Sequence, residues 1–227
     1  MLRQPPVIIT GLHSSRLHVL NDRPVHSDRS YIVYWMTSAR RLGSNFALER
    51  AVDHAVTLRR PLVILEALRC GYEHANDRLH LFVMQGMAAH ARALSKGRVV
   101  YYPYVEPGPG AGSGLLAALA GDACVVVTDW YPAFFLPRML ASAATQIETR
   151  MEAVDTNGIL PVTAHRARSR RRMDSARTFN ETSARSWQSG YDRLWPEREI
   201  FGTVRYMSST NTAKKLRVKR YLEIYGR

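Results

Sequence analysis

The sequence predicts an α/β fold: a Rossmann-like parallel five-stranded sheet sandwiched by helices, with a basic irregular C-terminal extension. Three observations support this prediction. Short runs of apolar, β-branched and aromatic residues alternate with segments of helical periodicity. One run, YIVYWM at residues 31–36, is apolar throughout, which is typical of a strand covered on both faces. The formal net charge of +13 is concentrated in the last part of the chain.

The strand at residues 31–36 is expected to lie at the centre of the sheet and to be followed by a helix over residues 44–58. Ser44 is a suitable N-cap, because its side-chain oxygen accepts a hydrogen bond from the first turn. Pro61 ends the helix, because proline has no backbone N–H to donate.

The second helix is expected over residues 76–95, with Asn76 as its N-cap and Gly97 as the residue that stops it. Apolar residues at helical spacing define the face that we expect to be buried. They are Leu79, Phe82, Val83, Met87 and Leu94.

The rest of the chain up to residue 164 continues the alternation. Strands are predicted at residues 62–66, 99–104, 123–129 and 151–154, and helices at residues 115–120 and 133–146. Alternation of this kind predicts parallel pairing with right-handed crossovers. The first 30 residues are expected to be an irregular lead, in which residues 7–10 form either a short strand or an apolar anchor.

Composition narrows the class of protein. The chain has 227 residues, of which 46% are hydrophobic, enough for a sizeable core. No apolar run reaches the roughly 18 residues that span a bilayer, and no signal-peptide core is visible, so a soluble cytoplasmic protein without membrane contact is expected. Cys70 and Cys124 are expected to be buried bystanders. The eight histidines show no chelating spacing, so no metal site is expected.

The positive charge is unevenly distributed. Residues 1–164 hold 16 Lys/Arg and 13 Asp/Glu, whereas residues 165–227 hold 16 and 6. This excess favours contacts with phosphate groups, although a solvated basic tail is the simpler alternative. The side chains expected to contact DNA are Arg168, Arg170, Arg171, Arg172, Lys214, Lys215, Arg217, Lys219 and Arg220.

Two features near the predicted strand ends are candidates for ligand binding. The glycine- and proline-rich loop at residues 107–114 precedes a helix, which suits phosphate binding. It lacks the Lys-Ser/Thr of a P-loop, so a plain crossover loop is the alternative. The carboxylates Glu66, Glu106 and Asp129 either face a ligand beyond the strand ends or serve as turn residues.

Several segments are similar to the class II cyclobutane pyrimidine dimer photolyases. In the first part they are NDRPV (21–25), YIVYWMTSARR (31–41), NFAL (45–48), VVVTD (125–129) and VDTNGILP (154–161). The common family pattern has Arg-Asp where Ser38 and Ala39 stand, and Trp where Phe46 stands. The chain therefore resembles a divergent branch of that family.

The end of the chain resembles the extreme C-terminus of the same family. The similar segment is WPEREIFGTVRYM (195–207), followed by Lys214, Lys215, Leu216 and Tyr221. In the family, a large helical domain that binds FAD and receives the flipped dimer lies between these two parts. The residues that remain here, roughly 175–190, are too few for it. The resemblance therefore implies three parts: an antenna-type α/β domain at 31–164, a basic linker at 165–190 and a remnant of the catalytic domain at 191–227.

The resemblance implies a protein related to light-dependent DNA repair, internally truncated and unable to act as a lyase alone. It also implies UV-damaged DNA as a partner and a deazaflavin-type antenna chromophore. The residues expected to line the antenna site are Trp35, Met36, Thr37, Tyr104, Glu106 and Asp129. Two alternatives remain open: a stand-alone nucleotide- or DNA-binding module with a basic arm and no catalytic activity, and an inactive gene remnant.

Overall fold

The computed structural model describes residues 12, 14–95, 97, 99–158 and 161–162. Within them it confirms the α/β class, with a mostly parallel six-stranded sheet flanked by helices. The elements in chain order are η1 (Ser14–Arg16), β1 (Leu17–Val19), β2 (Tyr31–Met36), α1 (Phe46–Leu58), β3 (Leu62–Leu68), α2 (Asp77–Leu94), β4 (Val100–Val105), α3 (Leu115–Ala120), β5 (Ala123–Trp130), α4 (Leu136–Gln146) and β6 (Met151–Asp155).

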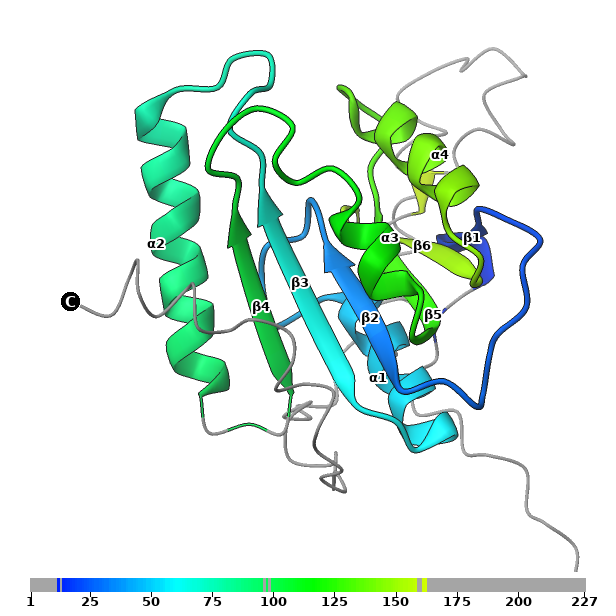
Figure 1. Cartoon of the computed structure of the whole chain (residues 1–227). Helices are drawn as coiled ribbons and strands as arrows, with labels where there is room; N and C mark the ends of the chain where they lie inside the picture. The colour runs from blue at the N-terminus through cyan, green and yellow to red at the C-terminus, as the bar shows by residue number, and fades with distance from the viewer. Residues whose placement is uncertain (1–11, 13, 96, 98, 159–160, 163–227) are drawn as a thin grey trace, which may run out of the picture.

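The strands are ordered β1-β6-β5-β2-β3-β4, so β2 lies inside the sheet, between β5 and β3. All six residues of β2 are buried, as the continuous apolar run predicts. The strands from β6 through β5, β2 and β3 to the edge strand β4 pair in parallel. In Figure 1 the arrowheads of β2, β3 and β4 lie at the same end. The loops that follow these strands therefore gather at one end of the molecule.

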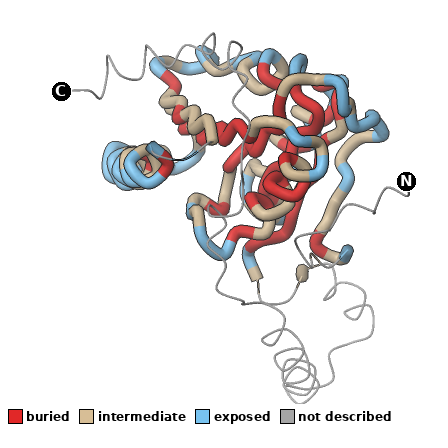
Figure 2. The backbone as a smooth tube through the Cα atoms, turned by 90° about the horizontal axis from the view of Figure 1, so that it is seen from below, coloured by how far each residue is buried: buried red, intermediate tan, exposed pale blue. Residues whose placement is uncertain are grey.

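Side chains alternate between the two faces of β2 and build two separate cores. Ile32, Tyr34 and Met36 pack with α1, whereas Tyr31, Val33 and Trp35 pack with α3 and α4. Figure 1 shows α3 in front of the sheet and α1 behind it. Burying each large apolar side chain contributes roughly 1.5–3 kcal/mol, and in Figure 2 the buried residues form the middle of the molecule. Trp35 is thereby fixed on the α3/α4 face.

The first helix begins one residue later than predicted. The N-cap of α1 is Asn45, whose Oδ1 accepts the backbone N–H of Leu48 at 3.0 Å. Ser44 has a positive φ of 52° and belongs to the preceding loop. The prediction of Ser44 as N-cap is therefore wrong, because the buried Asn45 makes both the cap and the contacts to that loop.

The second helix begins at its predicted N-cap, Asn76, but its buried face is narrower than predicted. Met87 and Leu94 are buried, whereas Leu79 is 38% exposed and Phe82 is 74% exposed. The prediction that Leu79 and Phe82 face the core is wrong. The reason is that α2 packs at the edge of the sheet, mainly on β4 and β3, so much of its outer surface faces away from the core (Figure 2).

A sixth strand, β1, was not predicted. It pairs antiparallel with β6, with Leu17 opposite Val154 and Val19 opposite Glu152. Three residues are too short for a periodic pattern, and the pairing partner is more than 130 positions away in sequence. Residues 7–10, the linker at 165–190 and residues 191–227 lie outside the described residues, and the expected division of the chain at 164 remains a prediction.

Candidate functional site

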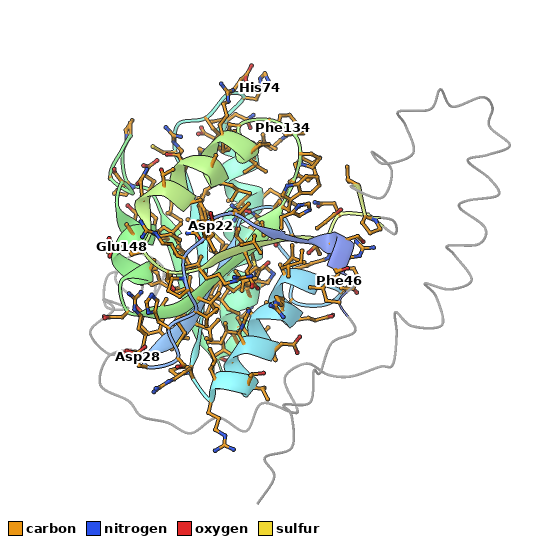
Figure 3. The ribbon with its side chains drawn as sticks, turned by 90° about the vertical axis from the view of Figure 1, so that its right-hand side faces the viewer. Asp22, Asp28, Phe46, His74, Phe134 and Glu148 are labelled. Carbon is orange, nitrogen blue, oxygen red and sulfur yellow. The ribbon has the colours of Figure 1, made fainter. Side chains whose placement is uncertain are left out.

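Three carboxylates lie near the carboxyl ends of the parallel strands, and each accepts hydrogen bonds from a neighbouring loop. Figure 3 shows this end of the molecule, where His74 and Phe134 lie, opposite the end with Asp28. The side chain of Asp129, in β5, accepts the backbone N–H groups of Thr37, Ser38 and Ala39 at 2.8, 2.8 and 3.0 Å. Its other oxygen accepts the hydroxyl of Tyr34. Asp129 therefore fixes the loop that follows β2.

Glu66, near the end of β3, is the centre of a buried polar cluster. It accepts hydrogen bonds from Arg40 at 2.9 Å, from the Nδ1 side of His90 at 2.8 Å and from the hydroxyl of Tyr101 at 2.6 Å. Burial alone would raise the pKa of Glu66, but these donors and the charge of Arg40 hold it below its ordinary value. Arg40 also donates to the carbonyl of Ala67, so this cluster joins the loop after β2 to β3.

Glu106, directly after β4, holds the glycine loop, which we define as residues 107–114. Its Oε1 accepts the backbone N–H groups of Gly110 and Gly112 at 3.0 and 3.2 Å, and its Oε2 accepts the N–H of Cys70 at 2.9 Å. Burial opposes ionisation, but these backbone donors lower the pKa of Glu106. The glycine loop is thus a bound element, and not a loose crossover.

A cavity of about 410 Å³ lies beside the carboxyl end of β2, and we call it the Trp35 cavity. It is bounded by the glycine loop, by α3 and α4, and by the residue that follows β3. Seven of the thirteen lining residues have apolar side chains, and Trp35 and Phe135 are the aromatic groups. The lining residues are Trp35, Arg69, Gly112, Gly114, Leu116, Ala117, Phe135, Arg138, Met139, Ser142, Ala143, Gln146 and Ile147.

Close packing shapes the wall of the Trp35 cavity at Gly112. A Cβ atom at Gly112 would lie 3.1 Å from Cε1 of Tyr104 and 3.5 Å from Oε1 of Glu106. Gly114 has φ of 77°, in the left-handed region that favours glycine. The sequence of the loop therefore fits the path by which it closes one side of the cavity.

The six residues predicted for a cofactor site are not all at the cavity. Trp35 lines it directly, and Tyr104 and Glu106 support Gly112 from behind. Met36 is fully buried on the opposite face of the sheet with α1. Thr37 and Asp129 bind one another. The structure thus places one of the six, Trp35, in the cavity lining and two others, Tyr104 and Glu106, beside Gly112 of the glycine loop. A cofactor role for any of the six stays a prediction.

Two cavity residues that the sequence reading missed carry charge. Arg69 directly follows β3 and Arg138 lies in the first turn of α4. The position of Arg69 after a parallel strand was a usable signal, because ligands bind beyond such ends. Arg138 gave no comparable signal in the sequence. The basic residues predicted to bind DNA, from Arg168 to Arg220, lie outside the described residues.

Glu152 of β6 forms a second buried charge cluster on the α1 side. Its carboxylate, 1% exposed, accepts from Arg50 at 2.8 Å, His54 at 2.9 Å and Arg150 at 2.9 Å. These partners overcome the cost of burial and lower the pKa of Glu152. Two of these partners come from α1 and the third directly precedes β6, so the cluster joins α1 to β6.

Two observations on the described part of the chain concern metals and membranes. No group of three or more His, Cys, Asp and Glu side chains in it is arranged to hold a metal ion. None of its helices is long and apolar enough to cross a bilayer. Of the two cysteines, Cys124 is buried, whereas Cys70 is partly exposed and lies 3.2 Å from the Glu106 carboxylate.

Comparison with known proteins finds a photo-lyase of similar sequence. A deoxyribodipyrimidine photo-lyase from Methanothermobacter thermautotrophicus is 29% identical over 151 residues, which cover 66% of this chain and 33% of that protein. The chain is a distant homologue of this photo-lyase. Its described α/β fold is like the N-terminal domain of photolyases, as the resemblance implied. Because the match covers only a third of the photo-lyase, the homology alone does not give the chain that enzyme's activity.

The other comparisons add little to the photo-lyase relationship. No family model matches the chain. Among solved structures, a universal stress protein in complex with cAMP has a TM-score of 0.35 and 20% identity, and covers 57% of this chain and 100% of its own. A similarity this weak carries no argument about function.

Proposed function

We propose that this photo-lyase homologue is an antenna-type module, which binds a planar aromatic chromophore in the Trp35 cavity and cannot repair DNA by itself. The observation that carries the proposal is the cavity's place and lining. It lies at the carboxyl end of a central parallel strand, where ligands of such sheets bind. Its volume of about 410 Å³ falls within the range of small-molecule sites.

The lining fits a flat aromatic compound. Trp35 is 9% exposed, and it lines the cavity. Leu116, Met139 and Ile147 supply apolar contacts from α3, from α4 and from the residue after α4. Stacking of an aromatic ligand ring on an aromatic side chain contributes about 0.5–1.5 kcal/mol beyond the burial of apolar surface. When bound, a deazaflavin-type chromophore would absorb light; the residues here would hold and orient it.

The inability to repair is inferred from the chain's internal spacing. In the photolyases that the chain resembles, a large helical domain lies between the segments similar to 31–164 and 191–227. Only the 26 residues 165–190 stand there in this chain. They are too few to enclose FAD and a flipped base, which require a concave pocket. Purified chain should therefore leave pyrimidine dimers intact under blue light, and detectable repair would contradict this part of the proposal.

The absorption spectrum of the purified chain tests the chromophore directly. We expect a band outside the range of protein absorption, released by heat, without the bands of a flavin. Trp35→Ala should lose the band. Met36→Leu is the matched control, because Met36 is the next residue of the same strand but faces α1. Loss of the band in both variants, or in neither, would contradict the assignment of the Trp35 cavity.

A DNA-binding module with no catalytic activity is the second candidate, favoured by the charge of the last part of the chain. Residues 165–227 carry 16 Lys/Arg against 6 Asp/Glu. Contacts of such residues with phosphates make affinity fall steeply with salt. DNA affinity that falls with salt in the full chain, and disappears when residues 165–227 are removed, would support this candidate. Affinity that survives the removal would contradict it.

A further inference from the structure

The Trp35 cavity carries positive charge that no residue of its lining balances. Two of its lining residues, Arg69 and Arg138, are cationic, and none is acidic. Neither guanidinium forms a hydrogen bond or ion pair within the described part of the chain. Other arginines of the described residues are paired: Arg40 is bound to Glu66, and Arg50 and Arg150 are bound to Glu152.

The backbone holds Arg69 in place beside the cavity. On one side of it, the carbonyl of Leu68 accepts the N–H of Glu106 at 2.9 Å. On the other side, the N–H of Cys70 donates to the carboxylate of Glu106 at 2.9 Å. Both neighbours are thus tied to the residue that also holds the glycine loop. Arg69 therefore lines the cavity from a backbone that is held on both sides, and its side chain has no hydrogen bond or ion pair within the described residues.

Arg138 stands where a cation is electrostatically disfavoured. It lies in the first turn of α4, an 11-residue helix with no acidic residue in that turn and no side-chain cap at Phe135. The positive end of a helix dipole repels a cation in the first turn. A negative group between α4 and Arg69 would relieve this repulsion and neutralise both guanidinium groups, each of which can bind a carboxylate or a phosphate bidentately.

We infer that the ligand of the Trp35 cavity carries an acidic group, a phosphate or a carboxylate, and that Arg69 and Arg138 bind it. The inference rests on the proposed function, since it assumes that the cavity holds an aromatic ligand. The apolar wall around Trp35 receives the ring system, and the two arginines receive the anion at the rim. Ligands that share a ring system but differ in charge are thereby distinguished.

Riboflavin and flavin mononucleotide form a matched pair of probes, because they share one ring system and differ only in the phosphate. We expect wild-type chain, stripped of any chromophore, to bind flavin mononucleotide roughly tenfold more tightly at low salt, with the advantage shrinking as salt screens the contact. Binding is measured by quenching of flavin fluorescence. Arg69→Gln and Arg138→Gln should each remove most of the advantage and leave riboflavin affinity unchanged.

Three controls separate the possible failures. Arg92→Gln removes one exposed positive charge from the last turn of α2, outside the cavity, and should change neither affinity. Arg69→Lys and Arg138→Lys should retain part of the advantage. Trp35→Ala should weaken both flavins equally, because it removes the ring contact.

The outcomes distinguish this inference from the proposed function. Equal affinity for both flavins, or an advantage that survives in both glutamine variants, would overturn the role of the arginines and leave the aromatic site standing. Failure of wild-type chain to bind either flavin would overturn the site itself. Adenosine monophosphate binding as tightly as flavin mononucleotide would overturn the chromophore proposal while supporting the anion contact.

Discussion

The hydroxyl of Tyr34 donates a hydrogen bond to Oδ1 of Asp129 at 2.7 Å, between two adjacent buried strands. The same hydroxyl accepts the side-chain N–H of Asn45 at 2.9 Å. Burial and the carboxylate of Asp129 raise the pKa of Tyr34 well above its ordinary value, so it remains a donor. One phenol thus joins β2, β5 and the N-cap of α1.

Tyr34→Phe should be clearly destabilising for this reason. It removes a donor from a buried carboxylate, and a hydrogen bond to a charged group contributes about 1.5–3 kcal/mol. We expect the free energy of unfolding to fall by about 2 kcal/mol and Tm to fall by about 4–8 °C. Tyr72→Phe is the matched control, since the Tyr72 hydroxyl has no hydrogen bond within the described residues. Equal effects of the two substitutions in thermal unfolding would contradict the role of Tyr34.

Glu49 should make stability fall as pH rises. Burial, with a smaller contribution from Asp53, raises the pKa of Glu49 from 4.5 to about 7. Between these values the unfolded chain releases the proton while the folded chain keeps it, so rising pH favours unfolding. After allowance for partial exposure, this group lowers stability by about 2 kcal/mol between pH 5 and 8.

Glu49→Gln should remove this penalty. The variant should match the wild type at pH 5 and exceed its stability in urea unfolding at pH 8. Glu73→Gln, which removes a side chain that is 85% exposed, should change stability little at either pH. Parallel pH profiles of Glu49→Gln and wild type would show that Glu49 titrates normally.

Glu152, in contrast to Glu49, should make stability fall as pH falls. Its folded-state pKa is lowered, so the stability it contributes is fully present above the ordinary value of 4.5 and is lost as pH falls below it. Glu152→Gln should cost about 3 kcal/mol at pH 7, because removing one partner of a buried ion pair leaves the other uncompensated. The difference from wild type should shrink below pH 4 in denaturant titrations. A constant difference across this range would contradict the prediction.

Glu106 should control the cavity without lining it. In Glu106→Gln, one acceptor oxygen becomes an NH2 group that cannot accept, so the remaining oxygen can no longer hold Cys70 and the pair Gly110 and Gly112 at once. Hydrogen exchange at Gly110 and Gly112 should speed up by roughly tenfold, the equivalent of about 1.4 kcal/mol. The affinity of the Trp35 cavity for flavin mononucleotide should fall in the same variant. Ser113→Ala alters an exposed side chain of the same loop and should leave both measurements unchanged.

The sequence predicted a structural feature well when the contacts that determine it are made by residues close together in the chain. The strand at Tyr31–Met36 was predicted correctly because six consecutive apolar residues need cover on both faces. The strand-end carboxylates were placed at the correct end of the sheet, but their partners could not be predicted. The three N–H groups on Asp129 come from a loop about 90 positions away, and only the folded backbone aligns them.

The candidate site was predicted only in part for the same reason. Trp35 was identified from its place near the end of a strand. Arg69 and Arg138 are 69 positions apart and share no motif, so their approach to one cavity follows from tertiary packing. The N-cap at Asn45 was missed because Ser44 is an equally good cap by residue type, and the contacts with Tyr34 and Ala39 decide between them.

The narrow buried face of α2 gives a prediction for two residues on one helix. Met87 is 2% exposed, so Met87→Ala should cost about 2–4 kcal/mol through lost burial and the cavity left behind. Phe82 is 74% exposed, so Phe82→Ala should stay within about 0.5 kcal/mol of wild type, aided by the better helix propensity of alanine. Urea unfolding of the two variants measures the difference. A cost above 2 kcal/mol for Phe82→Ala would mean that Phe82 is covered in solution, as the helical periodicity alone suggested.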